Sequence, residues 1–200
     1  MTVPSNQIET IKSNKLLRNS AQKGGGLCIG AYSNVVFSNM LIAGNSSQSY
    51  GGGVFADSYS NAQILNSTIT NNISHYTASN GSGIFPADYA SLIVSNSIVW
   101  GNRGTDIYTT FGTQVTYSIL GSANAGVGNV VANPLFSDTA AGNYRVKAGS
   151  PAIDTGRNTA ASGVTVDLDG VLRPVDGDGS KGTTGDGSDY DKGAFEFRRF

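Results

Sequence analysis

The chain repeats itself at intervals of 27 and then 30 residues. Three glycine-rich runs each introduce a short apolar segment: GGGLCI at 24–29, GGGVFA at 51–56 and GSGIFP at 81–86. Partial copies precede and follow them, ending at Asn19 and running over VTYSIL at 115–120. A single unit cannot bury its own apolar face, so neighbouring units must stack into a continuous core. Five columns of like residues keep one register: Leu27/Val54/Ile84, Tyr32/Tyr59/Tyr89, Phe37/Ile64/Val94, Asn39/Asn66/Asn96 and Asn45/Asn72/Asn102.

The composition of each repeat predicts strands and not helices. Glycine triplets and Asn-rich runs break helices, whereas short β-branched segments between polar turns are typical of a solenoid. We predict an all-β parallel β-helix of about four to five coils, right-handed by the crossover preference of parallel strands. Leu27, Val54 and Ile84 should face the interior, because side chains alternate along a strand. The Asn columns should lie at bends, with left-handed backbone and amide hydrogen bonds between coils.

The same repeat resembles a known family. An apolar-x-x-Asn element follows the glycine-led strands, as in Ile42–Asn45 and Val99–Asn102. This combination resembles the pectin-lyase-like right-handed β-helix repeats of bacterial surface proteins. The last third is similar to the choice-of-anchor Q type of C-terminal region. The resemblance implies an exported bacterial protein located outside the cell or at its surface, and it implies no defined reaction. The similar segments are NPLFSD at 133–138, YRVKAGSPAIDTG at 144–156, DLDGVLRPVDGDG at 167–179 and DKGAFEF at 191–197.

Charge is distributed unevenly along the chain. Thirteen Lys and Arg against fourteen Asp and Glu give a net charge of −1, which argues against a nucleic-acid partner. No Lys or Arg lies between Lys23 and Arg103, where the only acidic residues are Asp57 and Asp88. The end of the chain is instead rich in Gly and Asp. We therefore predict two regions: β-helix coils over 1–133 and an irregular C-terminal cap or tail over 134–200, packed on or beside the coils.

Other features exclude whole classes of protein. No apolar run approaches the ~18 residues of a membrane-spanning helix, and MTVPSNQIET is too polar for a signal peptide. The single Cys excludes an internal disulfide.

The chain begins within a repeat, and an uncapped β-helix end exposes unpaired backbone groups. We expect either a preceding region in a longer parent protein or end-to-end self-association of this chain.

Aromatic residues provide the candidate binding surface. Tyr32, Tyr59 and Tyr89 occupy equivalent turns, so their rings should form a ladder along the solenoid axis. Strand alternation also points Phe55 and Phe85 outward. Aromatic rings at the ~4.8 Å spacing of stacked strands suit the apolar face of a sugar chain, and the uncharged surroundings favour a neutral glycan. In the alternative interpretation the rings only stabilise adjacent coils, with Phe55 and Phe85 covered by the tail.

Catalysis would depend on very few side chains. Asp57 and Asp88 lie in adjacent coils but one position out of register, and His75 lies in the lengthened turn between them. A glycoside hydrolase needs a carboxylate pair, for which these are the weak candidates. A lyase needs a cationic base, and the body of the repeat contains no Lys or Arg. Two turn aspartates in a solenoid are otherwise solvated surface groups, so we assign no catalytic residue.

The acidic tail is a candidate calcium site. Carboxylates recur every second or third residue among glycines, and a flexible loop of this kind can supply the six to eight oxygens that Ca²⁺ prefers. Bound calcium would stabilise the tail and take no part in catalysis. In the alternative interpretation these loops are solvated, or Asp167 and Asp191 pair with Arg173. The candidate ligands are Asp176, Asp178, Asp186 and Asp189.

Among these interpretations we favour a non-catalytic extracellular or cell-surface β-helix module that binds a glycan or mediates adhesion. A polysaccharide-active lyase or glycoside hydrolase is the alternative. A self-assembling structural protein that stacks end to end is the third. The enzyme hypothesis rests only on the fact that polysaccharide-active enzymes often have this fold, and a fold does not establish a function.

Overall fold

The structure, a computed structural model, describes residues 8–76, 81–158, 163–176 and 190–198. These residues form strands and turns. They contain no helix, and therefore no helix long and apolar enough to cross a membrane. Four parallel sheets, named A to D here, make up the β-helix. Sheet A contains β1 (Glu9–Lys12), β5 (Asn34–Ser38), β9 (Asn61–Leu65), β13 (Ser91–Ser95) and β15 (Thr113–Thr116). Sheet B contains β2 (Lys15–Leu17), β6 (Leu41–Ala43), β10 (Thr68–Thr70), β14 (Ile98–Trp100), β16 (Ile119–Leu120) and β17 (Val130–Val131). Sheet C contains β3 (Ser20–Ala21), β7 (Ser46–Ser47) and β11 (Ile73–Ser74), and sheet D contains β4 (Leu27–Ile29), β8 (Val54–Ala56) and β12 (Ile84–Pro86).

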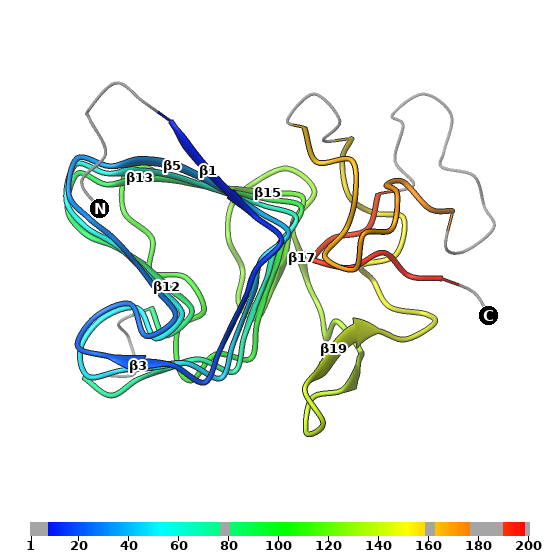
Figure 1. Cartoon of the computed structure of the whole chain (residues 1–200), viewed down its shortest axis with the longest axis horizontal. Coiled ribbons are helices and arrows are strands. Elements are labelled where there is room, and N and C mark those ends of the chain that lie inside the picture. Colours follow the sequence, from blue (N-terminus) through cyan, green and yellow to red (C-terminus); the bar gives the residue numbers. More distant parts are fainter. Residues whose placement is uncertain (1–7, 77–80, 159–162, 177–189, 199–200) are drawn as a thin grey trace.

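The chain passes through sheets A, B, C and D in turn, and successive coils lie directly over one another (Figure 1). Within the described residues, three coils carry a strand in all four sheets. The following coil reaches sheets C and D only through the single bridges Ile73↔Arg103 and Ile84↔Ile107. The all-β parallel β-helix is confirmed. The prediction of about four to five coils overcounts the complete ones, because the repeat loses its short C and D strands after β12.

The interior of the coils is a continuous column of apolar side chains. The predicted register is confirmed, since Leu27 pairs with Val54 and Val54 with Ile84. Val54 and Ile84 are completely buried, and Leu27 packs half-buried against the same cluster at the first coil. Glycine is required where the coils approach one another. A Cβ on Gly53 would lie 2.5 Å from the carbonyl oxygen of Gly83, so the glycine runs allow close stacking.

The sequence predicts left-handed backbone and hydrogen bonds between coils for both asparagine columns. In the structure one column has the left-handed backbone and the other forms the hydrogen bonds from coil to coil. Asn39, Asn66 and Asn96 adopt left-handed backbone, with φ of 52°, 45° and 49°. The other column forms a ladder: the amide of Asn45 donates to Asn72 over 2.9 Å, and that of Asn72 donates to Asn102 over 2.9 Å. Each rung thereby satisfies buried polar groups of two coils. Asn19 begins the ladder and Asp106 ends it, accepting from the Asn102 amide at 2.8 Å.

The described residues from 134 onward, called the tail here, lie along one flank of the β-helix (Figure 1). The tail contains the antiparallel hairpin β18 (Phe136–Asp138) and β19 (Asn143–Val146), followed by irregular chain. It covers the outer face of sheet B, where Leu41 packs against Tyr144 and Phe195, and Ile98 against Ile153. Hydrogen bonds hold the same contact, since Ala194 N donates to Thr68 Oγ1 over 3.1 Å and Arg157 N to Asn96 Oδ1 over 2.9 Å.

Candidate functional site

The predicted tyrosine ladder, formed by Tyr32, Tyr59 and Tyr89, lies at the turns that connect sheet D to sheet A. Each tyrosine is the third residue of a four-residue turn and adopts a φ of 60° to 62°. The rings stack in parallel, with centroids 5.2 Å and 5.1 Å apart and interplanar angles of 3° and 5°. Left-handed backbone costs a non-glycine residue about 1 kcal/mol or more. The coil register and the ring stacking hold all three tyrosines in this conformation.

The ladder exposes ring edges more than ring faces. Tyr32, Tyr59 and Tyr89 are 65%, 49% and 77% exposed. Because Tyr59 lies parallel to both neighbours, its two faces are covered by their rings. A sugar stacks on the face of an aromatic ring and not on its edge. Stacking positions therefore remain only at the two ends of the ladder, one of which is Tyr89.

A groove of about 710 Å³ adjoins the Tyr89 end of the ladder. It is lined on one side by Asp88, Tyr89 and Ser91 and on the other by Thr110 and Phe111, from the turn of the next coil. The Phe111 side chain is fully exposed. This surface, called the tyrosine groove here, places two aromatic rings beside a carboxylate and two hydroxyl groups.

Phe111 and Thr110 were not among the residues that the repeat predicts. The step from β13 to β15 is only 21 residues. Extending the tyrosine column by the 27 or 30 residues of the earlier steps therefore passes beyond this turn. In TFGT at 110–113, Thr113 N donates to Thr110 O over 3.0 Å, as Ala90 N does to Ala87 O in the tyrosine turn above. Aligning these two turns places Gly112, and not Phe111, at the tyrosine position, so the repeat contains no signal that points to Phe111.

The outward phenylalanines lie on sheet D and are mostly covered. Phe55 is only 2% exposed, and its ring stacks on Phe85 at 6.1 Å. Tyr50 packs on Phe85 at 4.6 Å, and Lys23 Nζ lies 4.8 Å above the Phe55 ring. This cover comes from the β-helix itself, whereas the tail packs on sheet B. Phe55 therefore presents no ring face to a ligand, and the expectation that the tail covers it is wrong.

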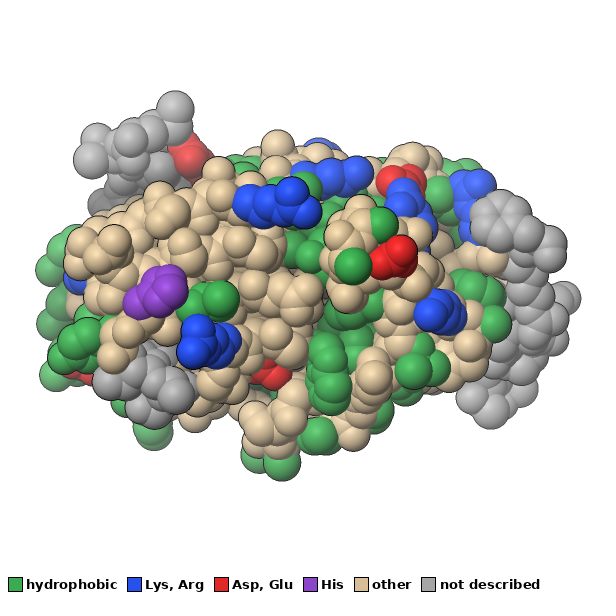
Figure 2. All heavy atoms as spheres, turned by 90° about the horizontal axis from the view of Figure 1, so that it is seen from below, with side chains coloured by type: hydrophobic (Ala, Val, Ile, Leu, Met, Phe, Trp, Pro, Cys, Tyr) green, Lys and Arg blue, Asp and Glu red, His purple; other side chains and the backbone are tan. Residues whose placement is uncertain are grey.

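The structure does not assemble the weak catalytic candidates into one site. Asp57 is half-buried, and its carboxylate accepts Ser58 N over 2.8 Å. Asp88 is exposed in the following D–A turn, whereas His75 is exposed after β11, beside sheet C. His75 is the one purple side chain in Figure 2. In the part of the chain that the structure describes, no hydrogen bond or ion pair joins any two of these three residues.

Three of the four candidate calcium ligands, Asp178, Asp186 and Asp189, lie outside the described residues. Asp176 is described and exposed. Among the described residues, no group of three or more His, Cys, Asp or Glu side chains could hold a metal ion. The calcium site stays a prediction.

The tail contains a buried cluster of charged side chains. Arg173 and Glu196 form an ion pair in which both side chains are completely buried. Arg173 Nη1 and Nη2 also donate to the carbonyls of Asp191 and Gly193 over 3.2 Å and 2.8 Å. Among the described residues, neither the Asp167 nor the Asp191 carboxylate forms an ion pair with Arg173, so that alternative pairing is wrong. Both carboxylates accept main-chain N–H groups and attract the Arg173 charge only from a longer distance.

Burial determines how this cluster titrates. Desolvation, reinforced by the nearby Glu196 carboxylate, raises the pKa of Asp191 to about 8. Desolvation lowers the pKa of Lys192 to about 8, while its Nζ donates to Gly128 O over 3.0 Å. Shifted pKa values also occur in structural ion-pair networks. These groups join the tail to itself and to the last coil, so we assign them a structural role.

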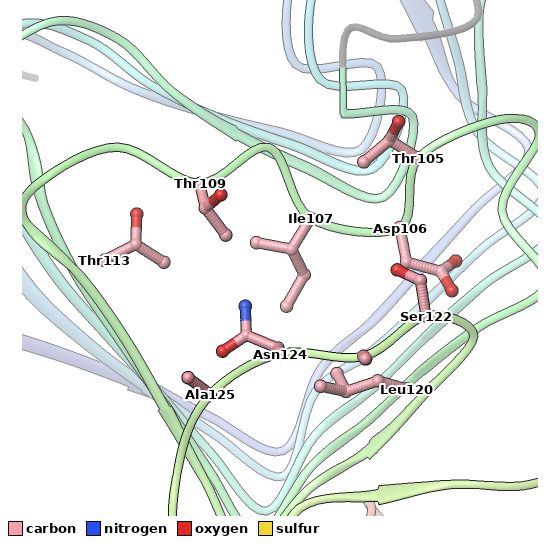
Figure 3. A pocket seen from close by; sticks show the side chains of 10 residues that line it. Thr105, Asp106, Ile107, Thr109, Thr113, Leu120, Ser122, Asn124 and Ala125 are labelled. Carbon is pink, nitrogen blue, oxygen red and sulfur yellow. The ribbon is translucent and has the colours of Figure 1, made fainter.

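The open C-terminal end of the β-helix forms another cavity, of about 440 Å³ (Figure 3). Figure 3 shows Ile107 and Asn124 pointing into this space, which is the lumen of the last coil. Asp106 lies at its margin, with its carboxylate accepting Asn102 N and Gly121 N, both over 2.9 Å. Burial raises the pKa of Asp106. The carboxylate completes the asparagine ladder and is already fully engaged, so the charged group at this cavity serves the fold.

Comparison with known proteins gives one match. A family model described as "Right handed beta helix region" matches residues 4–149, well over half of the chain. No curated protein and no solved structure matches.

Proposed function

Because the chain belongs to the right-handed β-helix family, we propose that it is a non-catalytic β-helix module that binds a neutral glycan in the tyrosine groove. The observation that carries this proposal is the position of Tyr89. It ends the ladder with one ring face turned away from Tyr59, and Phe111 flanks the same groove. Two aromatic faces beside a few polar groups is the composition of a sugar site, since rings cover the apolar face of a pyranose.

Polar groups and charge support the neutral glycan. Asp88, Ser91 and Thr110 line the groove and can exchange hydrogen bonds with sugar hydroxyl groups. No Lys or Arg occurs between Lys23 and Arg103, so the ladder offers no cation for an acidic polysaccharide. The ladder itself is a rigid base for the terminal ring, since Tyr59 fixes the orientation of Tyr89 by stacking.

We further propose an extracellular or cell-surface location and a bacterial source, with the tail acting as a choice-of-anchor Q type region. These proposals rest on the motifs of the sequence. Fractionation of the native host, with detection of the protein in the surface or secreted fraction, tests the location.

The experiment for binding is retention on a panel of immobilised neutral and acidic polysaccharides, with chain length followed in the same tubes. We expect retention on a neutral polysaccharide without shortening. Tyr89→Ala should weaken retention about tenfold or more. A tenfold loss corresponds to about 1.4 kcal/mol of binding free energy, which is what we expect the stacked ring to contribute. Tyr32→Ala is the matched control, since it removes the same ring at the other end of the ladder and should leave retention nearly unchanged. Equal losses in both variants, or retention on no polysaccharide, would contradict the proposal.

A glycoside hydrolase is the alternative, and one observation favours it: the Asp88 carboxylate lines the tyrosine groove. Hydrolysis requires a second carboxylate about 5–10 Å away, and Asp88 is the only acid among the residues that line the groove. Shortening of a polysaccharide that is lost in Asp88→Asn would establish the enzyme and overturn the non-catalytic proposal.

A further inference from the structure

The tail forms an open-sided cavity of about 730 Å³ that is separate from the tyrosine groove. Three segments line this tail cavity: residues 143–148 from β19 onward, the loop at 167–171 and the chain at 196–198. Its walls combine the apolar side chains of Val146, Val171 and Phe197 with charged groups. Small-molecule sites typically have this composition and volume, with a mostly apolar wall and a few polar groups that orient the ligand.

The acidic side chains of the tail cavity already have partners. The Asp167 carboxylate accepts three main-chain N–H groups at 2.8–2.9 Å. Glu196 forms the buried ion pair with Arg173, and Asp169 is paired with Arg145. The Arg145 guanidinium is held further by the Phe195 ring, 4.7 Å below it. These carboxylates are therefore occupied by donors from the protein, and none is left to bind a cationic ligand.

Two cations of the same cavity have no such partners among the described residues. Lys147 and Arg198 line it and are exposed. Within the described residues the only ion pairs are Arg145–Asp169 and Arg173–Glu196, so neither cation lies within 4.0 Å of a described carboxylate. Their side chains also form no hydrogen bond there. The cavity thus pairs an apolar wall with two positive charges that no described carboxylate compensates, and an incoming anion would supply a counter-ion to both.

We propose that the tail cavity binds a small organic carboxylate. The carboxylate group lies between Lys147 and Arg198, where it can accept two parallel hydrogen bonds from the guanidinium. The apolar body of the ligand packs on Val146, Val171 and Phe197. This site shares no residue with the tyrosine groove, so it is independent of glycan binding.

Benzoate and benzamide are a suitable probe pair, because they have the same ring and nearly the same size and differ in charge. We expect benzoate to cause saturable changes in the amide NMR signals of residues around the tail cavity, with no such saturation by benzamide. The double variant Lys147→Gln/Arg198→Gln should weaken benzoate binding about tenfold or more, as expected when two charge-assisted contacts are lost. Arg103→Gln, on the β-helix, is the control and should bind benzoate as the unmodified protein does.

Inorganic phosphate and the groove variant complete the test. Phosphate has charge without an apolar body, so we expect it to bind more weakly than benzoate. Equal binding of phosphate and benzoate would overturn the role of the apolar wall. Equal binding of benzoate and benzamide, or unchanged binding in the double variant, would overturn the role of the two cations. Tyr89→Ala should leave benzoate binding intact, which keeps failure of this proposal distinguishable from failure of the glycan proposal.

Discussion

The two outer flanks of the β-helix use the same backbone for different purposes. On sheet B the outward side chains Leu41, Ile98 and Ile119 are almost completely buried, because the tail packs over them. At the D–A turns the outward residues are Tyr32, Tyr59 and Tyr89, which remain about half exposed or more. The coil register supports both surfaces equally, since each residue stacks on its copy in the next coil.

The difference shows that a solenoid interior and a solenoid surface follow separate rules. The interior must be apolar in every coil, and the aliphatic columns satisfy that requirement along the whole axis. An outer column must be apolar only where another segment covers it. Aliphatic outer residues on sheet B therefore mark an intramolecular contact, whereas the amphipathic tyrosines, each with a hydroxyl group, suit a surface that remains in water.

The largest effect should come from the ion pair that anchors the covering tail. Arg173→Met leaves Glu196 buried without its partner and frees two buried carbonyls, so we expect a loss of about 3–5 kcal/mol in the free energy of unfolding. Equilibrium urea unfolding measures it. Arg145→Met is the matched control, because it breaks an exposed Arg–carboxylate pair and should cost about 1 kcal/mol or less. Similar costs for the two variants would show that the tail is not held by the buried pair.

The covered and open outer faces can be compared directly on one coil. Ile98 on β14 is buried under the tail, whereas Ile93 on β13 points outward from sheet A and is half-buried. We expect Ile98→Ala to cost about 2–4 kcal/mol, because it leaves a cavity. Ile93→Ala should cost about 1 kcal/mol or less, since less apolar surface is lost. A cost for Ile93→Ala as large as that for Ile98→Ala, by the same urea measurement, would mean that sheet A is also covered.

The pH dependence of the tail should depend on two opposing groups. Burial raises the pKa of Asp191 from 3.8 to about 8, so stability falls as pH rises from about 4 and levels off above 8. Burial lowers the pKa of Lys192 from 10.5 to about 8, so stability recovers as pH rises from 8 towards 10.5. In the unmodified protein the loss mostly below pH 8 and the recovery above it oppose each other, so stability differs little between about pH 7 and pH 9. In Lys192→Met only the loss remains, and the free energy of unfolding should fall by about 1 kcal/mol between about pH 7 and 9. A variant whose stability rises with pH in this window would contradict the assignment.

The smallest effect concerns calcium in the acidic tail. If Asp176 and the three aspartates that follow it bind Ca²⁺ with modest affinity, calcium should stabilise the protein by about 1 kcal/mol or less and raise Tm by about 2–4 °C. Thermal unfolding with calcium and with EDTA measures the shift, and magnesium is the control ion. An identical Tm in calcium and EDTA would remove the prediction.

Much of the candidate site could be predicted from the repeat, and the errors have physical causes. The tyrosine ladder was predictable because equivalent turn positions must stack in a parallel β-helix. The burial of Phe55 was not, because its cover comes from Tyr50 and Lys23 in irregular segments between strands. Phe111 was missed because the repeat shortens to a step of 21 residues before it. The exposed edges of the ladder were also not predictable, since ring orientation depends on the left-handed backbone of each tyrosine.

The sequence by itself determined the β-helix, its register and its inward columns. Those contacts join each residue to its copy in the next coil, so a periodic pattern contains them. Only the tertiary structure decided which outer face the tail covers, that Arg173 pairs with Glu196, and that Lys147 and Arg198 meet at one cavity. These contacts join segments that occur once in the chain. No spacing predicts them, because they depend on how the irregular chain folds back along the flank of sheet B.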